Sequence, residues 1–312
     1  MTTMPIDPAA MASPEDMALQ VRALGSDFNA EVLAATRAIY RPRVDLAEAA
    51  VEAVDVAYGP HERHRLDVYR PGGACEAIVV FVHGGGFVAG DKNGDGVFYR
   101  NIGRWLARQG MAAVLPNYRL APADPWPAGA RDLQSVLQWL GRSAATFGAS
   151  PGQVPPVILW GQSAGASHVA SWLFDDTARG GPAIEVAGVM LMSGFFCVEA
   201  PLPPGPHAYF GEDAALYAQR APIAHVGPLA APLWLGVAEL DPGWIAHQTY
   251  ALAQAVTRAN GRSPDVAFFR GHNHVSTVQS MGSPQHDVAA EVLRFIRDLD
   301  VVMAGRNCLD GG

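Results

Sequence analysis

Residues 156–174 read PVILWGQSAGASHVASWLF. The first part of this stretch is a short apolar run, which predicts a buried strand, and its last part has the apolar spacing of an amphipathic helix. Ser163 lies between the two, in the pattern Gly161-x-Ser163-x-Gly165. A nucleophile elbow needs a strand before the serine, a helix after it, and glycines where the tight turn admits no side chain. We therefore expect a strand–turn–helix unit that presents the Ser163 hydroxyl.

A second stretch, GASPG at residues 148–152, matches the same glycine–serine pattern around Ser150. It follows a helical stretch and runs directly into Pro151, so it has no strand before the serine. Because the elbow requires that strand, Ser150 is interpreted as a loop residue and Ser163 as the nucleophile.

Apolar strands and amphipathic helices alternate on both sides of the elbow. A hairpin is expected at residues 54–58 and 65–69, followed by a regular alternation that predicts a mostly parallel sheet of about eight strands, with helices on both faces. Ligands of such sheets bind where the strands end. Strands are expected at Ile78–Val82, 113–116, 157–160, 186–192, 233–237 and 266–269, and helices at 97–109, 131–147, 164–173, 245–260 and 287–299.

Two segments fall outside this alternation. The first fifty residues predict two helices, one with Ser13 as its N-cap and one that starts near Asn29 and ends before Pro42. Residues 199–232 are rich in proline, alanine and aromatic residues, with a short helical piece at 213–219. We interpret residues 1–50 and 199–232 as small cap elements of a single domain, residues 1–312, that cover the site.

Composition excludes several classes of protein. The chain has 312 residues, 49% of them hydrophobic, and a net charge of −8 without a basic block, which argues against disorder and against nucleic-acid binding. It has no apolar run long enough to span a membrane, and its N-terminus lacks the pattern of a signal peptide. Three scattered cysteines exclude a disulfide scaffold, so the cytoplasm is expected. The only lysine, Lys92, is interpreted as half of a solvated pair with Asp91.

A glycine-rich loop follows the expected strand Ile78–Val82. It reads HGGGF at residues 83–87, and three glycines in a row let backbone N–H groups turn toward a ligand without an intervening Cβ. A serine nucleophile needs such donors for the oxyanion that develops on its substrate. Candidate donors are the N–H groups of Gly84, Gly85, Gly86 and Ala164.

The order of these motifs carries a resemblance. HGGGF, then NYRLAP at residues 117–122, GQSAG at 161–165, an Asp-Pro step and a late histidine resemble the α/β-hydrolase fold. More narrowly, the chain resembles the esterases related to hormone-sensitive lipase and the arylformamidase and feruloyl-esterase-like group, to which YGPHERHRLDVYRP at residues 58–71 is closer. The resemblance covers about residues 54–296. Gln162 stands where many relatives have Asp or His.

The resemblance also selects an acid and a base. Asp241, in the Asp-Pro step after the strand at 233–237, matches the position of the acid, with Glu239 as its rival. His274 matches the Gly271-x-x-His pattern, with His272 as its rival. The chain order Ser–Asp–His is that of the α/β-hydrolases. Ser163 would attack, His274 would act as general base, and Asp241 would orient the imidazole.

The leading hypothesis is a serine carboxylesterase that cleaves small-acyl or aryl esters through an acyl-enzyme and needs no cofactor or metal. An arylformamidase with the same residues, acting on an N-formyl aryl amide such as N-formylkynurenine, is the alternative. A non-catalytic receptor of the same fold is disfavoured because serine, acid and histidine are all available.

The resemblance implies a homodimer. His61 and His64 are interpreted as a surface turn, not a metal pair. The expected substrate pocket consists of Phe87, Trp126, Tyr209, Phe210 and Trp244.

Overall fold

The computed structural model describes residues 13–148, 154–182 and 184–309, so Ser150 lies outside the described residues. They form an eight-stranded sheet in the order β1-β2-β4-β3-β5-β6-β7-β8. The first two strands are antiparallel to their neighbours and the others run parallel, which confirms the expected α/β-hydrolase sheet. The strands are β1 (Val51–Ala57), β2 (Arg65–Arg70), β3 (Ile78–Val82), β4 (Ala112–Pro116), β5 (Val157–Gln162), β6 (Gly188–Met192), β7 (Leu233–Leu240) and β8 (Asp265–Asn273).

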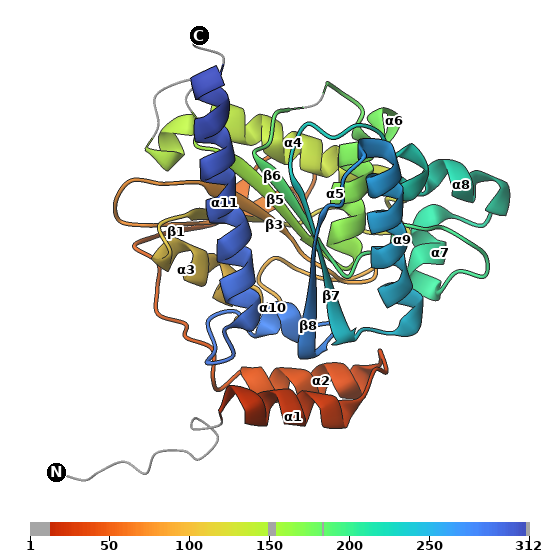
Figure 1. Cartoon of the computed structure of the whole chain (residues 1–312), viewed down its shortest axis with the longest axis horizontal. Coiled ribbons are helices and arrows are strands. Elements are labelled where there is room, and N and C mark those ends of the chain that lie inside the picture. The colour runs from red at the N-terminus through yellow and green to blue at the C-terminus, as the bar shows by residue number, and fades with distance from the viewer. Residues whose placement is uncertain (1–12, 149–153, 183, 310–312) are drawn as a thin grey trace.

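Helices cover both faces of this sheet (Figure 1). One apolar core lies between the sheet and α3 and α11, and a second lies between the sheet and α4, α5 and α9. Two small helices, α6 and α10, were not expected from the sequence. The helices beside the sheet are α3 (Arg100–Arg108), α4 (Ala128–Arg142), η2 (Ala144–Phe147), α5 (Ala164–Phe174), α6 (Asp176–Arg179), α9 (Gly243–Asn260), α10 (Ser276–Gln279) and α11 (Asp287–Leu309). Among the described helices, none combines the length and the apolar sequence that a membrane span requires.

The central strands place two motifs side by side. Every residue of β3 is buried, as its unbroken apolar sequence predicts for a strand covered on both faces. Strand β3 pairs in parallel with β5, and Val82 at its end lies opposite Gly161. The glycine-rich loop that follows β3 and the elbow that follows β5 therefore begin at the same edge of the sheet.

Two N-terminal helices lie across the ends of β7 and β8 (Figure 1). Helix α1 (Pro14–Leu24) begins with a capping box between Ser13 and Asp16, and the N-cap of α2 (Ala30–Tyr40) is Asn29. Their buried side chains, among them Met17 and Tyr40, pack against Val97 and Phe98 in a separate apolar cluster. Burial of these faces fixes the helices against the strand ends that carry the late histidine.

The segment 199–232 contains more helix than the sequence suggested. Its short pieces are α7 (Pro204–Phe210), η3 (Ala214–Leu216), α8 (Tyr217–Arg220) and η4 (Pro222–His225). Helix α7 was not expected because prolines usually break helices, but Pro204 and Pro206 both fall in its first turn. The N–H groups of a first turn have no partner within the helix, so a proline there removes no helical hydrogen bond.

Lys92 corrects the expectation of a solvated pair with Asp91. Its side chain is only 6% exposed, and Nζ lies 2.8 Å from Asp55 Oδ1 and 2.9 Å from Asp67 Oδ1. Although burial favours the neutral amine, the hydrogen bonds to the two carboxylates raise the pKa of Lys92 above its usual value. Lys92 is therefore a cation that joins the loop after β3 to strand β2, where Asp67 is fully buried.

We predict that Lys92→Met lowers the free energy of unfolding by about 3 kcal/mol, because it leaves the buried Asp67 carboxylate without its cation. Urea denaturation followed by circular dichroism measures this loss. Adding Asp67→Asn to Lys92→Met should recover part of it by removing the buried charge. An unchanged unfolding free energy in Lys92→Met would contradict this role of the pair.

Candidate active site

The elbow serine has a constrained backbone. Ser163 has φ 56° and ψ −125°, between the end of β5 and the first residue of α5. The two glycines of the motif allow this turn: a Cβ on Gly165 would lie 2.0 Å from the carbonyl oxygen of Val82, and one on Gly161 would lie 2.5 Å from the Cα of Ala166. Only glycine fits at these positions, so the motif is a consequence of how closely α5 approaches β3 and β5.

A hydrogen-bonded chain links serine, histidine and aspartate. The Nε2 atom of His274 lies 2.9 Å from Ser163 Oγ, and its Nδ1 atom lies 2.7 Å from Asp241 Oδ1. The other carboxylate oxygen, Oδ2, accepts hydrogen bonds from Ser193 Oγ at 2.7 Å and from the Ala238 N–H at 2.8 Å. Histidine and aspartate side chains are almost fully buried. Because both oxygens of Asp241 are engaged, its carboxylate holds the imidazole in one orientation.

The two rival residues have other partners. Glu239 Oε2 accepts hydrogen bonds from Arg22 at 2.9 Å and from the Gly271 N–H at 2.5 Å. His272 is fully buried and contacts Asp287 at 3.1 Å and Ser276 Oγ at 3.0 Å. Glu239 thus links the ends of β7 and β8, and His272 links the end of β8 to the start of α11. Neither residue contacts Ser163 in the described chain.

The glycine-rich loop offers unengaged donors beside the serine. Gly85 and Gly86 have φ values of 142° and 59°, and a Cβ on Gly85 would lie 1.9 Å from the carbonyl oxygen of Ala89. The N–H groups of Gly85 and Gly86 donate to no acceptor within the described residues, whereas the backbone of Gly84 forms a hydrogen bond with the Tyr99 side chain. The N–H of Ala164 belongs to the first turn of α5, where a helix supplies no partner. These donors can therefore bind an oxyanion beside Ser163.

Buried aromatic and imidazole rings support this loop. Tyr118 donates a hydrogen bond from its hydroxyl to the carbonyl oxygen of His83 at 2.9 Å, and the two rings stack at 4.5 Å. His83 Nδ1 lies 2.7 Å from the carbonyl oxygen of Gly84. Burial lowers the pKa of His83 to about 4, so the ring stays neutral near pH 7. A neutral donor there fixes the start of the loop without adding charge to the site.

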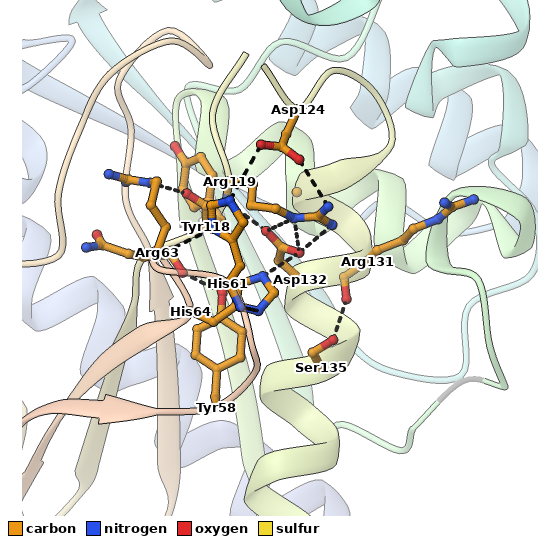
Figure 2. A network of polar contacts seen from close by, with 12 residues as sticks. Tyr58, His61, Arg63, His64, Tyr118, Arg119, Asp124, Arg131, Asp132 and Ser135 are labelled. Carbon is orange, nitrogen blue, oxygen red and sulfur yellow. Dashed lines mark hydrogen bonds and ion pairs between the residues drawn. The ribbon is translucent and has the colours of Figure 1, made fainter. Parts of the chain in front are cut away.

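Figure 2 shows the polar network behind Tyr118. Arg119 forms ion pairs with Asp132 at 2.8 Å and with Asp124 at 3.2 Å, and His64 Nε2 lies 3.2 Å from Asp132. The side chain of Arg63 donates to the Tyr118 carbonyl oxygen at 2.7 Å. This network holds the NYRLAP segment, and through it the glycine-rich loop.

His64 differs from its interpretation as a surface residue. It is buried and stacks on Tyr58 with ring centroids 4.7 Å apart, because the hairpin turn folds back over α4. His61 is partly exposed and lies 3.9 Å from Asp124. No group of three or more His, Cys, Asp or Glu residues in the described parts of the chain could hold a metal ion.

A cavity of about 310 Å³, which we call the apolar pocket, opens at Ser163. Of the expected pocket residues, Phe87 and Trp244 line it, and Trp244 is 40% exposed at its mouth. Tyr209 and Phe210 do not line it: both are buried behind Phe87, and the Tyr209 ring stacks on Phe87 at 4.7 Å. The other lining residues include Phe28, Val88, Phe195, Pro203, Pro204 and Ile245.

Trp126 is also displaced from the expected pocket. The backbone N–H of Trp126 donates to the carbonyl oxygen of Tyr209 at 2.9 Å, and the guanidinium of Arg220 lies 5.4 Å from the Trp126 ring. It therefore packs the segment 199–232 against the loop before α4. Aromatic residues of this segment pack with Phe87 and Phe195 in a separate apolar cluster, and sequence composition does not distinguish such a cluster from a pocket lining.

A second cavity, the polar pocket, has a volume of about 350 Å³ and shares Phe28 and Gly86 with the apolar pocket. Its lining includes Gly84, Gly85, Arg37, Asp91, Asp95 and Gln279. None of these four polar side chains was predicted from the sequence as a site residue.

Three further residues at the site were missed or left unassigned. Phe28 contacts the His274 ring edge-on, with centroids 4.8 Å apart, although it lies between the N-terminal helices. Gln162 donates from Nε2 to the carbonyl oxygen of His274 at 2.9 Å. Ser193 has φ 50° and immediately follows β6, so its place at the end of a parallel strand was a usable signal. For Phe28 the sequence carries no such signal.

Comparisons with known proteins agree with this architecture. A family model described as BD-FAE matches residues 66–174, the part that carries the glycine-rich loop and the elbow. Lipase 2 of Moraxella sp. is 37% identical over 95 residues, 30% of this chain and 21% of that protein. Carboxylic ester hydrolase LipN of Mycobacterium tuberculosis is 39% identical over 121 residues, 36% of this chain and 30% of that protein. The matches span less than a third of either relative.

Solved structures resemble nearly the whole chain. Esterase B of Lactobacillus rhamnosis, in an inhibited form, has a TM-score of 0.72 at 21% identity and covers 95% of this chain and 99% of its own. An esterase of the archaeon Pyrobaculum calidifontis has a TM-score of 0.65 at 19% identity, covering 93% and 92%. The chain has the α/β-hydrolase fold, and its resemblance to esterases of this fold is confirmed.

We predict that a fluorophosphonate probe labels this protein at one residue, Ser163, because His274 lies within hydrogen-bond distance of its hydroxyl. Mass spectrometry of tryptic peptides locates the label. Ser163→Ala should abolish labelling, while Ser150→Ala, which alters the other glycine–serine motif, should leave it intact. Labelling that persists in Ser163→Ala would show that the elbow serine is not the reactive group.

Proposed function

We propose that this protein is a serine carboxylesterase that hydrolyses small-acyl or aryl carboxylic esters through an acyl-enzyme. The observation that carries the proposal is the chain from Ser163 Oγ through His274 to Asp241, beside unengaged N–H donors. The named esterases among the relatives and structural neighbours support it. The proposal needs no metal or organic cofactor.

Acylation begins with the Ser163 hydroxyl. Its proton passes to His274 Nε2 as Oγ attacks the ester carbonyl, and the imidazolium that forms is stabilised by the Asp241 carboxylate. The carbonyl oxygen becomes an oxyanion, which accepts hydrogen bonds from the N–H groups of Gly85, Gly86 and Ala164. Loss of one such donor typically costs about 3 kcal/mol of transition-state stabilisation.

The tetrahedral intermediate then collapses. His274 returns the proton to the oxygen of the leaving alcohol, the C–O bond breaks, and the acyl group stays on Ser163. Water then attacks the acyl-enzyme with His274 again as the base, and the acid product leaves with Ser163 regenerated. Ser193 and Ala238 are positioning residues, because they donate hydrogen bonds to Asp241 and do not contact the reacting atoms.

The apolar pocket supports an ester substrate over a formamide. Ser163 lines this pocket, and an acyl group bonded to Ser163 would extend into its apolar space of about 310 Å³. A formyl group has no chain and would leave that space without contacts, whereas an alkyl or aryl acyl group would bury apolar surface there. The alternative, an arylformamidase, therefore ranks second.

Two subsidiary proposals concern the setting of the protein. Cys75 and Cys197 are free thiols, which supports the reducing cytoplasm as the compartment. The homodimer rests on the resemblance to esterases alone.

We predict that substitutions of Ser163 and Asp241 lower the rate of p-nitrophenyl butyrate hydrolysis by clearly different factors. Ser163→Ala should abolish turnover, and Asp241→Asn should lower kcat by about 10⁴-fold, because the imidazole loses its orienting carboxylate. Steady-state kinetics at neutral pH measures both effects.

Glu239→Gln is the matched control for Asp241→Asn, since Glu239 stands two residues earlier and pairs with Arg22. It should retain most of the activity. A larger loss in Glu239→Gln than in Asp241→Asn would contradict the assignment of the acid. Wild-type turnover of N-formylkynurenine in preference to every ester would contradict the esterase proposal.

We predict that Trp244→Ala shifts the preference among p-nitrophenyl acetate, butyrate and octanoate toward the longer chain, because removing the indole widens the mouth of the apolar pocket. The ratios of kcat/KM measure the shift. Phe268→Ala is the control: Phe268 is similarly exposed, at 48%, and lies on β8 outside both pockets. Equal profiles for wild type and Trp244→Ala would remove Trp244 from the acyl site.

A further inference from the structure

Both aromatic and charged side chains line the polar pocket, whereas none of the described residues that line the apolar pocket is charged. Phe28, Phe98 and Tyr99 provide the aromatic lining, and Arg37 approaches from helix α2. Ser163 lines the apolar pocket but not the polar one, while Gly84, Gly85 and Gly86 line the polar pocket. The two cavities thus meet at the glycine-rich loop, where an ester carbonyl would bind.

The two carboxylates of the polar pocket are already engaged. Asp91 accepts hydrogen bonds from the Asn117 side chain at 2.6 Å and from the Asn93 N–H at 2.8 Å. Asp95 forms an ion pair with Arg41 and accepts from the N–H groups of Val97 and Phe98, each at 3.1 Å. A ligand cation would therefore have to compete with donors that these carboxylates already have.

Unlike the two carboxylates, the Arg37 side chain is not engaged by a described neighbouring group. Its guanidinium forms no ion pair or hydrogen bond with any described residue, yet it lines the polar pocket. A guanidinium offers several N–H donors in a plane that matches the two oxygens of a carboxylate. Its unused donors make it the group in this pocket that is available to bind an anion.

Gln279 supplies an independent observation. It is 4% exposed and lines the same pocket, and its Oε1 is buried without a hydrogen-bond partner. Buried polar side-chain atoms normally have a partner, so an unpartnered amide here indicates a ligand that completes it. The two ends of a glutamine amide are interchangeable by rotation, so Gln279 can present an N–H group to a carboxylate.

Given the proposed esterase activity, the acyl group is bonded to Ser163 and must lie in the apolar pocket, which leaves the polar pocket for the leaving alcohol. We propose that the preferred substrates are esters of an aryl alcohol that bears a carboxylate. Arg37 and Gln279 bind the carboxylate, and the aromatic walls contact the ring. This inference rests on the proposed function, but it assigns the leaving-group side of the same site.

The test compares two acetate esters that share an aryl core. One is 4-acetoxybenzoate, and the other is 4-acetoxyacetophenone, in which a neutral acetyl group replaces the carboxylate. The ketone has the more acidic phenol as its leaving group, so intrinsic reactivity works against the expected result. In wild type, kcat/KM should be about tenfold higher for the carboxylate, and this preference should decrease at high salt.

Variants locate the preference. Arg37→Gln should bring the ratio of the two kcat/KM values to about one, and Gln279→Met should give an intermediate ratio. Arg258→Gln is the matched control, because Arg258 is exposed on α9 and lines neither pocket, and its ratio should equal that of wild type. Thermal unfolding midpoints close to that of wild type would show that the variants fold.

Binding gives a readout that needs no turnover. Calorimetry on Ser163→Ala should show tighter binding of 4-hydroxybenzoate than of 4-hydroxyacetophenone, and adding Arg37→Gln should remove the difference. Hydrolysis of both esters without a carboxylate preference, or a preference that survives Arg37→Gln, would overturn the inference while leaving the esterase proposal standing. Absence of hydrolysis together with absence of Ser163 labelling would overturn the proposed function, and the calorimetric difference would still decide the role of Arg37.

Discussion

Ser163 has φ 56° and ψ −125°, in a sparsely populated region of backbone space. Such a conformation costs on the order of 1–3 kcal/mol and persists only when the surrounding structure fixes it. Here the fixing contacts come from β5, paired on both sides within the sheet, and from α5, which approaches so closely that Gly161 and Gly165 have no room for a Cβ. The hydroxyl projects from the turn, and every other group of the site is placed relative to it.

The partners of Ser163 reach it through contacts between distant segments. Asp241 and His274 follow neighbouring strands, β7 and β8, and the N-terminal helices hold the loop that carries the histidine. Asn273 donates to Thr36 Oγ1 at 2.8 Å, and Phe28 contacts the imidazole directly. The N-terminal segment is therefore part of the site, and it also supplies Arg37 to the polar pocket.

Local patterns predicted the sheet, the elbow and the glycine-rich loop, because buried strands and tight turns depend on residues that are adjacent in the sequence. Local patterns do not predict the contacts between segments that are distant in the sequence. The sequence around Lys92 does not indicate that its side chain forms a buried ion pair with Asp67. An aromatic residue such as Tyr209 is equally compatible with a pocket lining and with the apolar cluster in which it lies. Arg37 and Gln279 looked like ordinary helical and loop residues, since only the folded chain brings them to one cavity.

The proposed function requires that Ser163 carries the acyl group during turnover. Rapid acid quench of wild-type protein with p-nitrophenyl butyrate, followed by mass spectrometry of the intact protein and its peptides, would detect this acyl group. We expect an early product burst and a single butyryl group on the peptide that contains Ser163, with none on Ser163→Ala. Turnover without any covalent adduct, or a butyryl group on another residue, would contradict the proposed function.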